Sequence, residues 1–239
     1  MEFIFDNRES KFKNIQVRWY LSSQNIWIGL QKKYFEIEEL IPKSYGSFQW
    51  LWSEADTLLF DRESLILSTA IFKINGLINL KQDKFAFSMA EKSSCNISLK
   101  YKDNFSISLS DTVDYFLGED ILFSYVSNLD HTIKLTKCML TEDFGLIVQN
   151  DLLMGWILYN ASIHLVPDED IFVNQGNSLL GLRKVLGEYL ELVKHLDTVS
   201  TEIEENEIKN KLELLFQEIK DYSHPQFIAI KNSISNLLE

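Results

Sequence analysis

Carboxylates between residues 103 and 182 are the side chains of this chain that are best suited to chemistry. The segment holds twelve acids but only two bases, Lys134 and Lys137, so it carries −10 of the chain's net charge of −12. The acids are Asp103, Asp111, Asp114, Glu119, Asp120, Asp130, Glu142, Asp143, Asp151, Asp168, Glu169 and Asp170. Carboxylates chelate hard cations, exchange protons with a substrate or attract a basic partner. A field of this sign repels nucleic acid and anionic lipid, so we expect neither as a partner.

The acids best spaced to chelate a divalent cation are Asp168, Glu169 and Asp170, which stand next to one another. They lack the regular alternation and the glycine of an EF-hand loop, which favours a solvated connector over a cation site. The chain contains no HExxH, CxxC, GxSxG, Walker or GxGxxG motif. His131 follows an aspartate in an expected turn and His224 precedes a proline near a helix start, which favours local structural roles. We therefore predict no catalytic residue, no metal ligand and no cofactor.

Aromatic residues stand beside several of the acids. Tyr115 and Phe116 follow Asp114, and Phe172 follows closely on Asp170. Aromatic side chains ringed by charge are typical of protein interfaces, although the same side chains also fill sheet cores. The predicted partner-binding residues are Asp111, Asp114, Tyr115, Phe116, Glu119, Asp120, Asp168, Glu169, Asp170 and Phe172.

Cysteine content and hydropathy indicate where the protein works. Cys95 and Cys138 are too few to frame a domain of this size, so we expect buried thiols. The first ten residues carry acids where a signal peptide has bases. The most apolar long window, 146–166, is broken by polar residues such as Asp151, unlike a membrane span. These features predict a cytoplasmic protein without membrane contact.

Before residue 175 the hydrophobic pattern has a period of two, which is typical of strands. Residues 15–21 alternate as in a half-buried strand, and residues 96–110 alternate on both sides of the turn residues 102–104, which predicts a hairpin. Segments 57–74 and 137–164 have polar turn residues between apolar runs, which indicates strand–turn–strand units.

After residue 177 the period becomes helical. A stripe of leucines and other apolar residues begins at Leu179, Thr201 and Glu204 have the spacing of a capping box, and Pro225 suits a first helical residue. Strands first and helices last predict an α+β protein. We expect a mainly antiparallel β-sheet domain over residues 1–176, with a helical region over 177–239 packed on or beside the sheet.

Two of the strand–turn–strand segments resemble parts of the small immunity proteins of bacterial contact-dependent and polymorphic toxin systems. The segments are TLLFDRESLILSTAIFKI (57–74) and MLTEDFGLIVQNDLLMGWILYNASIHL (139–165). The resemblance implies a cytoplasmic inhibitor that binds one cognate toxin, often a basic nuclease. It carries no individual site residue over to this chain.

Three functions remain open at this stage. The first is a non-catalytic acidic inhibitor whose carboxylates replace the phosphates in a basic toxin cleft. The second is a structural or assembly subunit that pairs through its C-terminal helices, with another chain or a second copy. The third, which the missing motifs disfavour, is a metal-dependent hydrolase that uses the acids of 103–182.

Overall fold

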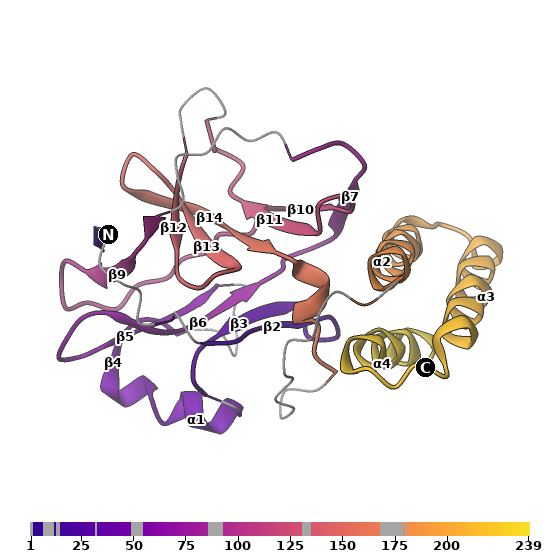
Figure 1. Cartoon of the computed structure of the whole chain (residues 1–239), viewed down its shortest axis with the longest axis horizontal. Helices are drawn as coiled ribbons and strands as arrows, with labels where there is room; N and C mark the ends of the chain where they lie inside the picture. The colour runs from indigo at the N-terminus through magenta and orange to yellow at the C-terminus, as the bar shows by residue number, and fades with distance from the viewer. Residues whose placement is uncertain are drawn as a thin grey trace.

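The computed structural model describes residues 2–6, 12, 15–31, 33–48, 55–85, 93–130, 135–167, 179 and 181–239. Strands occupy the first two thirds of the chain, and the three long helices follow them (Figure 1). The predicted α+β class is therefore confirmed. The predicted domain boundary near residue 176 lies outside the described residues.

The larger sheet has seven strands in the order β7-β10-β11-β14-β13-β12-β8. Its neighbours are antiparallel except at the two edges, where β7 pairs with β10 and β8 with β12 in parallel. The strands are β7 (Ile78–Lys81), β8 (Ser93–Ser94), β10 (Thr112–Phe116), β11 (Ile121–Tyr125), β12 (Thr136–Met139), β13 (Phe144–Gln149) and β14 (Leu152–Tyr159). The unit predicted over 137–164 is the β12–β13–β14 meander at the centre of this sheet.

The smaller sheet has five strands in the order β2-β3-β6-β5-β4, all antiparallel. Its strands are β2 (Val17–Tyr20), β3 (Asn25–Ile28), β4 (Ser44–Ser47), β5 (Thr57–Asp61) and β6 (Leu67–Lys73). The unit predicted over 57–74 is the β5–β6 hairpin. The strand predicted at 15–21 is β2, but all four of its residues are buried rather than every second one.

The predicted hairpin over 96–110 is wrong in its pairing. Its first half is β9 (Asn96–Leu99), which pairs with β1 (Phe3–Asp6) in a separate two-stranded sheet. The residues after it form no strand. Phe105 instead donates its N–H to the carbonyl of Gly46, and its ring meets that of Phe3 edge to face at 5.9 Å. Alternation predicts an extended chain with one apolar face, but it does not identify the strand that will pair with it.

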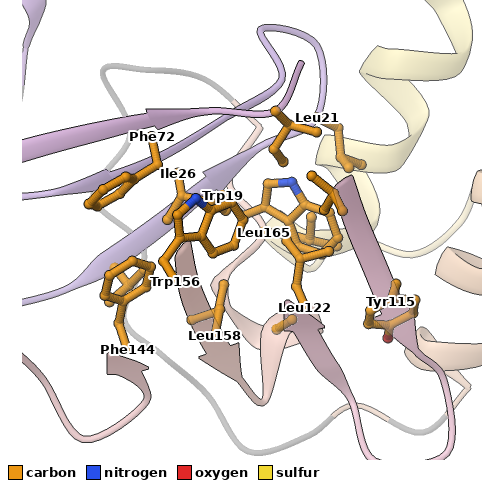
Figure 2. Close-up of a cluster of buried hydrophobic side chains, with 14 of the residues drawn as sticks. Trp19, Leu21, Ile26, Phe72, Tyr115, Leu122, Phe144, Trp156, Leu158 and Leu165 are labelled. Atoms are coloured by element: carbon orange, nitrogen blue, oxygen red, sulfur yellow. The ribbon is translucent and has the colours of Figure 1, made fainter. Parts of the chain in front are cut away.

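The main core lies between the inner faces of the two sheets. Phe72 of β6 stacks on Phe144 of β13 with ring centroids 5.3 Å apart, and Phe144 stacks on Trp156 of β14 at 5.9 Å. Trp19 of β2 lies 6.2 Å from Tyr115 of β10 (Figure 2). Aromatic pairs of this kind bury large areas and fix the two sheets in register against each other.

Short helical turns cover the outer face of the five-stranded sheet. They are α1 (Tyr34–Glu38) and the 3-10 turn η1 (Ile41–Lys43). Ile37 of α1 packs with Trp27 of β3 and Ile71 of β6 in a second, smaller cluster. Both faces of this sheet are therefore buried, which explains why the alternation in its strands is incomplete.

The C-terminal helices form a three-helix bundle beside the sheets (Figure 1). They are α2 (Leu182–Thr198), α3 (Glu202–Ile219) and α4 (Pro225–Leu238). Thr201 caps α3 by accepting a hydrogen bond from the Glu204 N–H at 3.3 Å, and Pro225 opens α4, both as predicted. Helix α2 packs against β7, and α4 against the 3-10 turn η2 (Ala161–His164). Helix α3 packs on the other two helices and lies farthest from the sheets.

Cys95 and Cys138 are both buried, but they form a disulfide rather than the predicted free thiols, with their Cα atoms 5.4 Å apart. Cys95 lies between β8 and β9, and Cys138 lies in β12. The bond therefore links the residue after the short edge strand β8 covalently to β12, the strand with which β8 pairs. A separation of 43 residues gave no sequence signal for this pairing.

Candidate partner-binding surface

The predicted acids around β10 do not share one face. Asp111 precedes β10, whereas Glu119 and Asp120 lie in the turn after it. A five-residue strand spans about 17 Å, so Asp111 and Glu119 lie at opposite ends of the seven-stranded sheet. Both are exposed, and Glu119 accepts a hydrogen bond from the Phe85 N–H. Asp111 and Glu119 therefore do not belong to one patch.

Asp114 is buried on the outer face of the seven-stranded sheet. Its carboxylate lies 3.7 Å from the ammonium of Lys81 on β7, and it accepts a hydrogen bond from the Tyr125 hydroxyl at 3.3 Å. Burial, with the nearby Asp114 charge, raises the pKa of Tyr125. Asp114 is thus part of the packing of β7, β10 and β11, and it is not accessible to a partner.

Asp120 is fully buried where the seven-stranded sheet meets the helices. It accepts hydrogen bonds from the Tyr115 hydroxyl at 2.8 Å, the Ser162 N–H at 2.9 Å and the Ser162 hydroxyl at 2.7 Å. Its carboxylate also lies 3.3 Å from Nε of Arg183 at the start of α2. Burial first, and then the Asp120 charge, raise the pKa of Tyr115. This network joins β10, η2 and α2, so Asp120 is structural.

The predicted aromatic anchors are core residues. Tyr115 points between the two sheets, as Figure 2 shows, and Phe116 packs edge to face on Phe85 at 5.0 Å on the outer face. For these two residues the alternative, that they fill the sheet's core, is correct. The remaining predicted binding residues, Asp168, Glu169, Asp170 and Phe172, lie outside the described part of the chain.

A different set of acids lies along one end of the seven-stranded sheet. Asp111, Asp130 and Asp151 are exposed there, and Leu152 beside them is 56% exposed. We call Asp111, Asp130, Asp151 and Leu152 the acidic edge. The strand order β10-β11-β14 places Asp111 and Leu152 two strand spacings apart, about 10 Å. An apolar side chain therefore lies among carboxylates that face solvent.

Hydrogen bonds fix the loop segment 126–130, which is the part of the connection after β11 that the structure describes. The Asp111 carboxylate accepts from the Ser127 N–H at 2.9 Å and from its hydroxyl at 3.0 Å. At the other end of the loop, Asp130 donates its N–H to the Gln149 side chain at 3.1 Å, and the Gln149 amide donates to the Asp130 carbonyl at 2.7 Å. The loop is thereby held to β10 and to the β13–β14 turn.

Sequence reasoning placed Asp111 in the binding set but missed Asp130, Asp151 and Leu152. A signal for two of these was available. Asn150 and Asp151 both adopt positive φ, as in the tight turns that join antiparallel strands and project from the sheet end. The sequence analysis already predicts a turn within 137–164, and a turn at Asn150 and Asp151 puts Asp151 and Leu152 at the end of the sheet. Asp130 has no such signal, because its contact with Gln149 joins residues 19 positions apart.

Little positive charge offsets these acids. Among the described residues of 103–182 the one base is Lys137, and its ammonium donates a hydrogen bond to the Tyr159 hydroxyl at 2.7 Å. Burial lowers the pKa of Lys137. The described residues of 103–182 therefore carry an excess of carboxylates over bases. An excess of carboxylates favours the approach of a basic surface.

Other polar side chains in the described residues serve the fold. His164 is buried with Nδ1 3.1 Å from the Val17 carbonyl and Nε2 3.1 Å from the Asp143 carboxylate, which ties η2 to β2 and to the turn before β13. The Ser162 hydroxyl donates to Asp120 and is fully buried, so a substrate has no access to it. Within the described residues, no group of three His, Cys, Asp or Glu side chains is placed to hold a metal ion.

Compared with protein-family models, curated proteins and solved structures, the chain matches none of them. No helix in the described part of the chain is long and apolar enough to cross a membrane.

Proposed function

We propose that this chain is a non-catalytic acidic binding protein, an immunity-type inhibitor that neutralises a basic cognate toxin by blocking its active site or substrate-binding surface. The observation that carries the proposal is the acidic edge, where three exposed aspartates and an exposed leucine lie along one end of the seven-stranded sheet.

The physical basis of inhibition is charge replacement. A toxin that cleaves nucleic acid holds phosphates in a basic cleft, and the carboxylates of Asp111, Asp130 and Asp151 present charge of the same sign as phosphate. Such complementarity accelerates the encounter of the two proteins. Leu152 supplies an exposed apolar contact beside these carboxylates, and interfaces usually combine apolar contacts with polar ones.

Preorganisation supports the same proposal. Because Ser127 and Gln149 hold the loop of the acidic edge by hydrogen bonds, its backbone has little freedom to lose on binding. A surface ordered before association avoids part of the entropy cost of complex formation.

The proposed location is the cytoplasm, where an immunity protein meets its toxin. The Cys95–Cys138 disulfide weighs against this part of the proposal, since cytosolic thiols are kept reduced. Alkylation of thiols during cell lysis decides the point, because a disulfide formed in the cell protects both cysteines from the reagent.

The proposed function is tested by capture of the partner from the source organism. The immobilised protein is incubated with lysate at low salt, and mass spectrometry identifies what elutes at high salt. We expect a basic toxin to bind the wild type and to be lost from the triple variant Asp111→Asn, Asp130→Asn, Asp151→Asn.

A matched control separates the acidic edge from total charge. Glu63, Glu142 and Glu218 are exposed and lie elsewhere on the molecule, so their combined change to Gln removes the same charge. Capture of the same proteins by the wild type and by both triple variants contradicts the proposal.

A further inference from the structure

A groove of about 650 Å³ runs between α3 and α4 at the outer side of the helix bundle. Its apolar lining comes from Leu214, Phe216 and Leu238. The polar residues that line it are Asn210, Glu213, Gln217, Ser235 and Glu239. A concave apolar strip with a polar rim is the form of surface that accepts an amphipathic helix.

The exposed side of α3 carries apolar residues that packing of the bundle does not require. Ile208, Leu212, Leu215 and Ile219 already form the buried stripe of this helix. Leu214 is 70% exposed and Ile203 is 74% exposed, and both belong to the opposite face. Packing of α3 against α2 and α4 does not require an apolar side chain at position 214.

The charge of the groove selects the kind of occupant. Two carboxylates line it, those of Glu213 and Glu239, and its lining contains no Lys, Arg or His. Lys209 on the same helix pairs with Glu205 at 2.7 Å, and Lys231 of α4 donates to backbone carbonyls of residues 220 and 222. The partners of these two ammonium groups are not among the residues that line the groove.

We propose that the α3–α4 groove binds an amphipathic helix of a protein partner, with apolar residues against Leu214, Phe216 and Leu238 and Lys or Arg beside Glu213 and Glu239. The inference takes the basic character of the partner from the proposed function and adds a second binding surface. A second copy of this chain fits poorly, because two such grooves face to face place Glu213 and Glu239 of both copies together. Like charges in contact oppose association.

The test uses defined peptides and the full chain. The probe is a fluorescent amphipathic helix of about 14 residues built from Leu and Lys, which covers about 21 Å of groove. The reference peptide has the same composition in scrambled order, so it has the same charge without an apolar face. Fluorescence anisotropy at moderate salt gives the two dissociation constants. We expect the amphipathic peptide to bind about tenfold or more tightly than the scrambled one.

Two exposed positions of α3 provide matched variants. Leu214→Lys adds one positive charge inside the groove, and Ile203→Lys adds the same charge three turns away, outside its lining. We expect Leu214→Lys to weaken binding of the amphipathic peptide by about tenfold or more and Ile203→Lys by less than about twofold. Equal effects of the two variants, no effect of Leu214→Lys, or equal binding of the two peptides overturns the inference.

Two further measurements separate this inference from its alternatives. A dimer of the free protein in analytical ultracentrifugation that dissociates on Leu214→Lys assigns the groove to a second copy and overturns it. The Asp111, Asp130 and Asp151 triple variant is titrated with the same peptide. If the triple variant loses binding of the peptide while Leu214→Lys keeps it, the peptide binds at the acidic edge and the groove is not a binding site. If Leu214→Lys loses binding while the triple variant keeps it, the result supports the groove.

Discussion

Asp56 shows how a single buried carboxylate organises distant parts of the sequence. It is fully buried and accepts the Lys73 N–H at 2.8 Å and the Leu109 N–H at 2.7 Å. Burial raises its pKa to about 7, although the two amide hydrogen bonds oppose the shift. No feature of the sequence predicts this role, because both donors are backbone groups that only the fold brings to position 56.

The raised pKa of Asp56 predicts a pH dependence of stability. In the folded protein the Asp56 carboxyl keeps its proton up to about pH 7, whereas in the unfolded chain it has the ordinary pKa of 3.8. The unfolded state therefore loses the proton first, and the free energy of unfolding falls between about pH 4 and pH 7 as pH rises. Each unit of pKa shift corresponds to about 1.4 kcal/mol.

Asp56→Asn tests this dependence. The amide does not titrate, so urea unfolding between pH 5 and 7.5 has a flatter pH profile than the wild type. The variant is also less stable at pH 5, since its side-chain nitrogen faces one N–H without accepting from it, at a cost of about 1–3 kcal/mol. Asp103→Asn, at an exposed site, serves as control. A pH profile as steep as that of the wild type contradicts the role of Asp56.

Asp120 gives a second prediction at the residue scale. Asp120→Ala leaves the Tyr115 hydroxyl and the Ser162 N–H buried without their acceptor, and we expect a loss of about 1–3 kcal/mol for each donor in urea unfolding. Arg183→Gln is expected to cost at most about 1 kcal/mol, because the Arg183 side chain is 39% exposed and screened by solvent. Equal losses in the two variants count against a structural role centred on Asp120.

The positions of strands and helices were predictable from the sequence where the local pattern of residues alone determines them. The capping spacing of Thr201 and Glu204 and the proline at 225 placed two helix starts, and polar turns placed the hairpins of 57–74 and 137–164. The pairing of β9 with β1 was not predictable, because alternation does not name a partner. The disulfide was not predicted for the same reason, because its two cysteines come together only when β8 pairs with β12.

The disulfide yields a prediction at the scale of elements. Closing a loop of 43 residues restricts the unfolded chain, so reduction is expected to lower the free energy of unfolding by about 2–4 kcal/mol. The wild type unfolds at lower urea in the presence of dithiothreitol, while the double variant Cys95→Ala, Cys138→Ala is insensitive to it. Labelling of both cysteines by a maleimide in denatured, unreduced protein shows that the bond is absent and sinks the prediction.

At the scale of the whole molecule, the sequence predicted that the surface charge is negative. It did not predict which of the acids are exposed. The excess of acids in 103–182 is a property of composition, and exposed Asp111, Asp130 and Asp151 preserve it. Asp114 and Asp120 lie in the same run of sequence, yet both are buried beside bases from β7 and α2. Such pairs depend on contacts distant in the chain, so local sequence gives no signal of which acids remain on the surface.

The central claim, that a basic partner approaches the acidic edge, is tested most directly by association kinetics with the captured partner. Rates are measured by stopped flow at about 50 mM and 150 mM salt, where screening differs. The account predicts that replacing Asp111, Asp130 and Asp151 with Asn slows association and flattens its salt dependence, whereas replacing Glu63, Glu142 and Glu218 with Gln changes both less. Unchanged rates in the first variant, or equal changes in the two, contradict the claim.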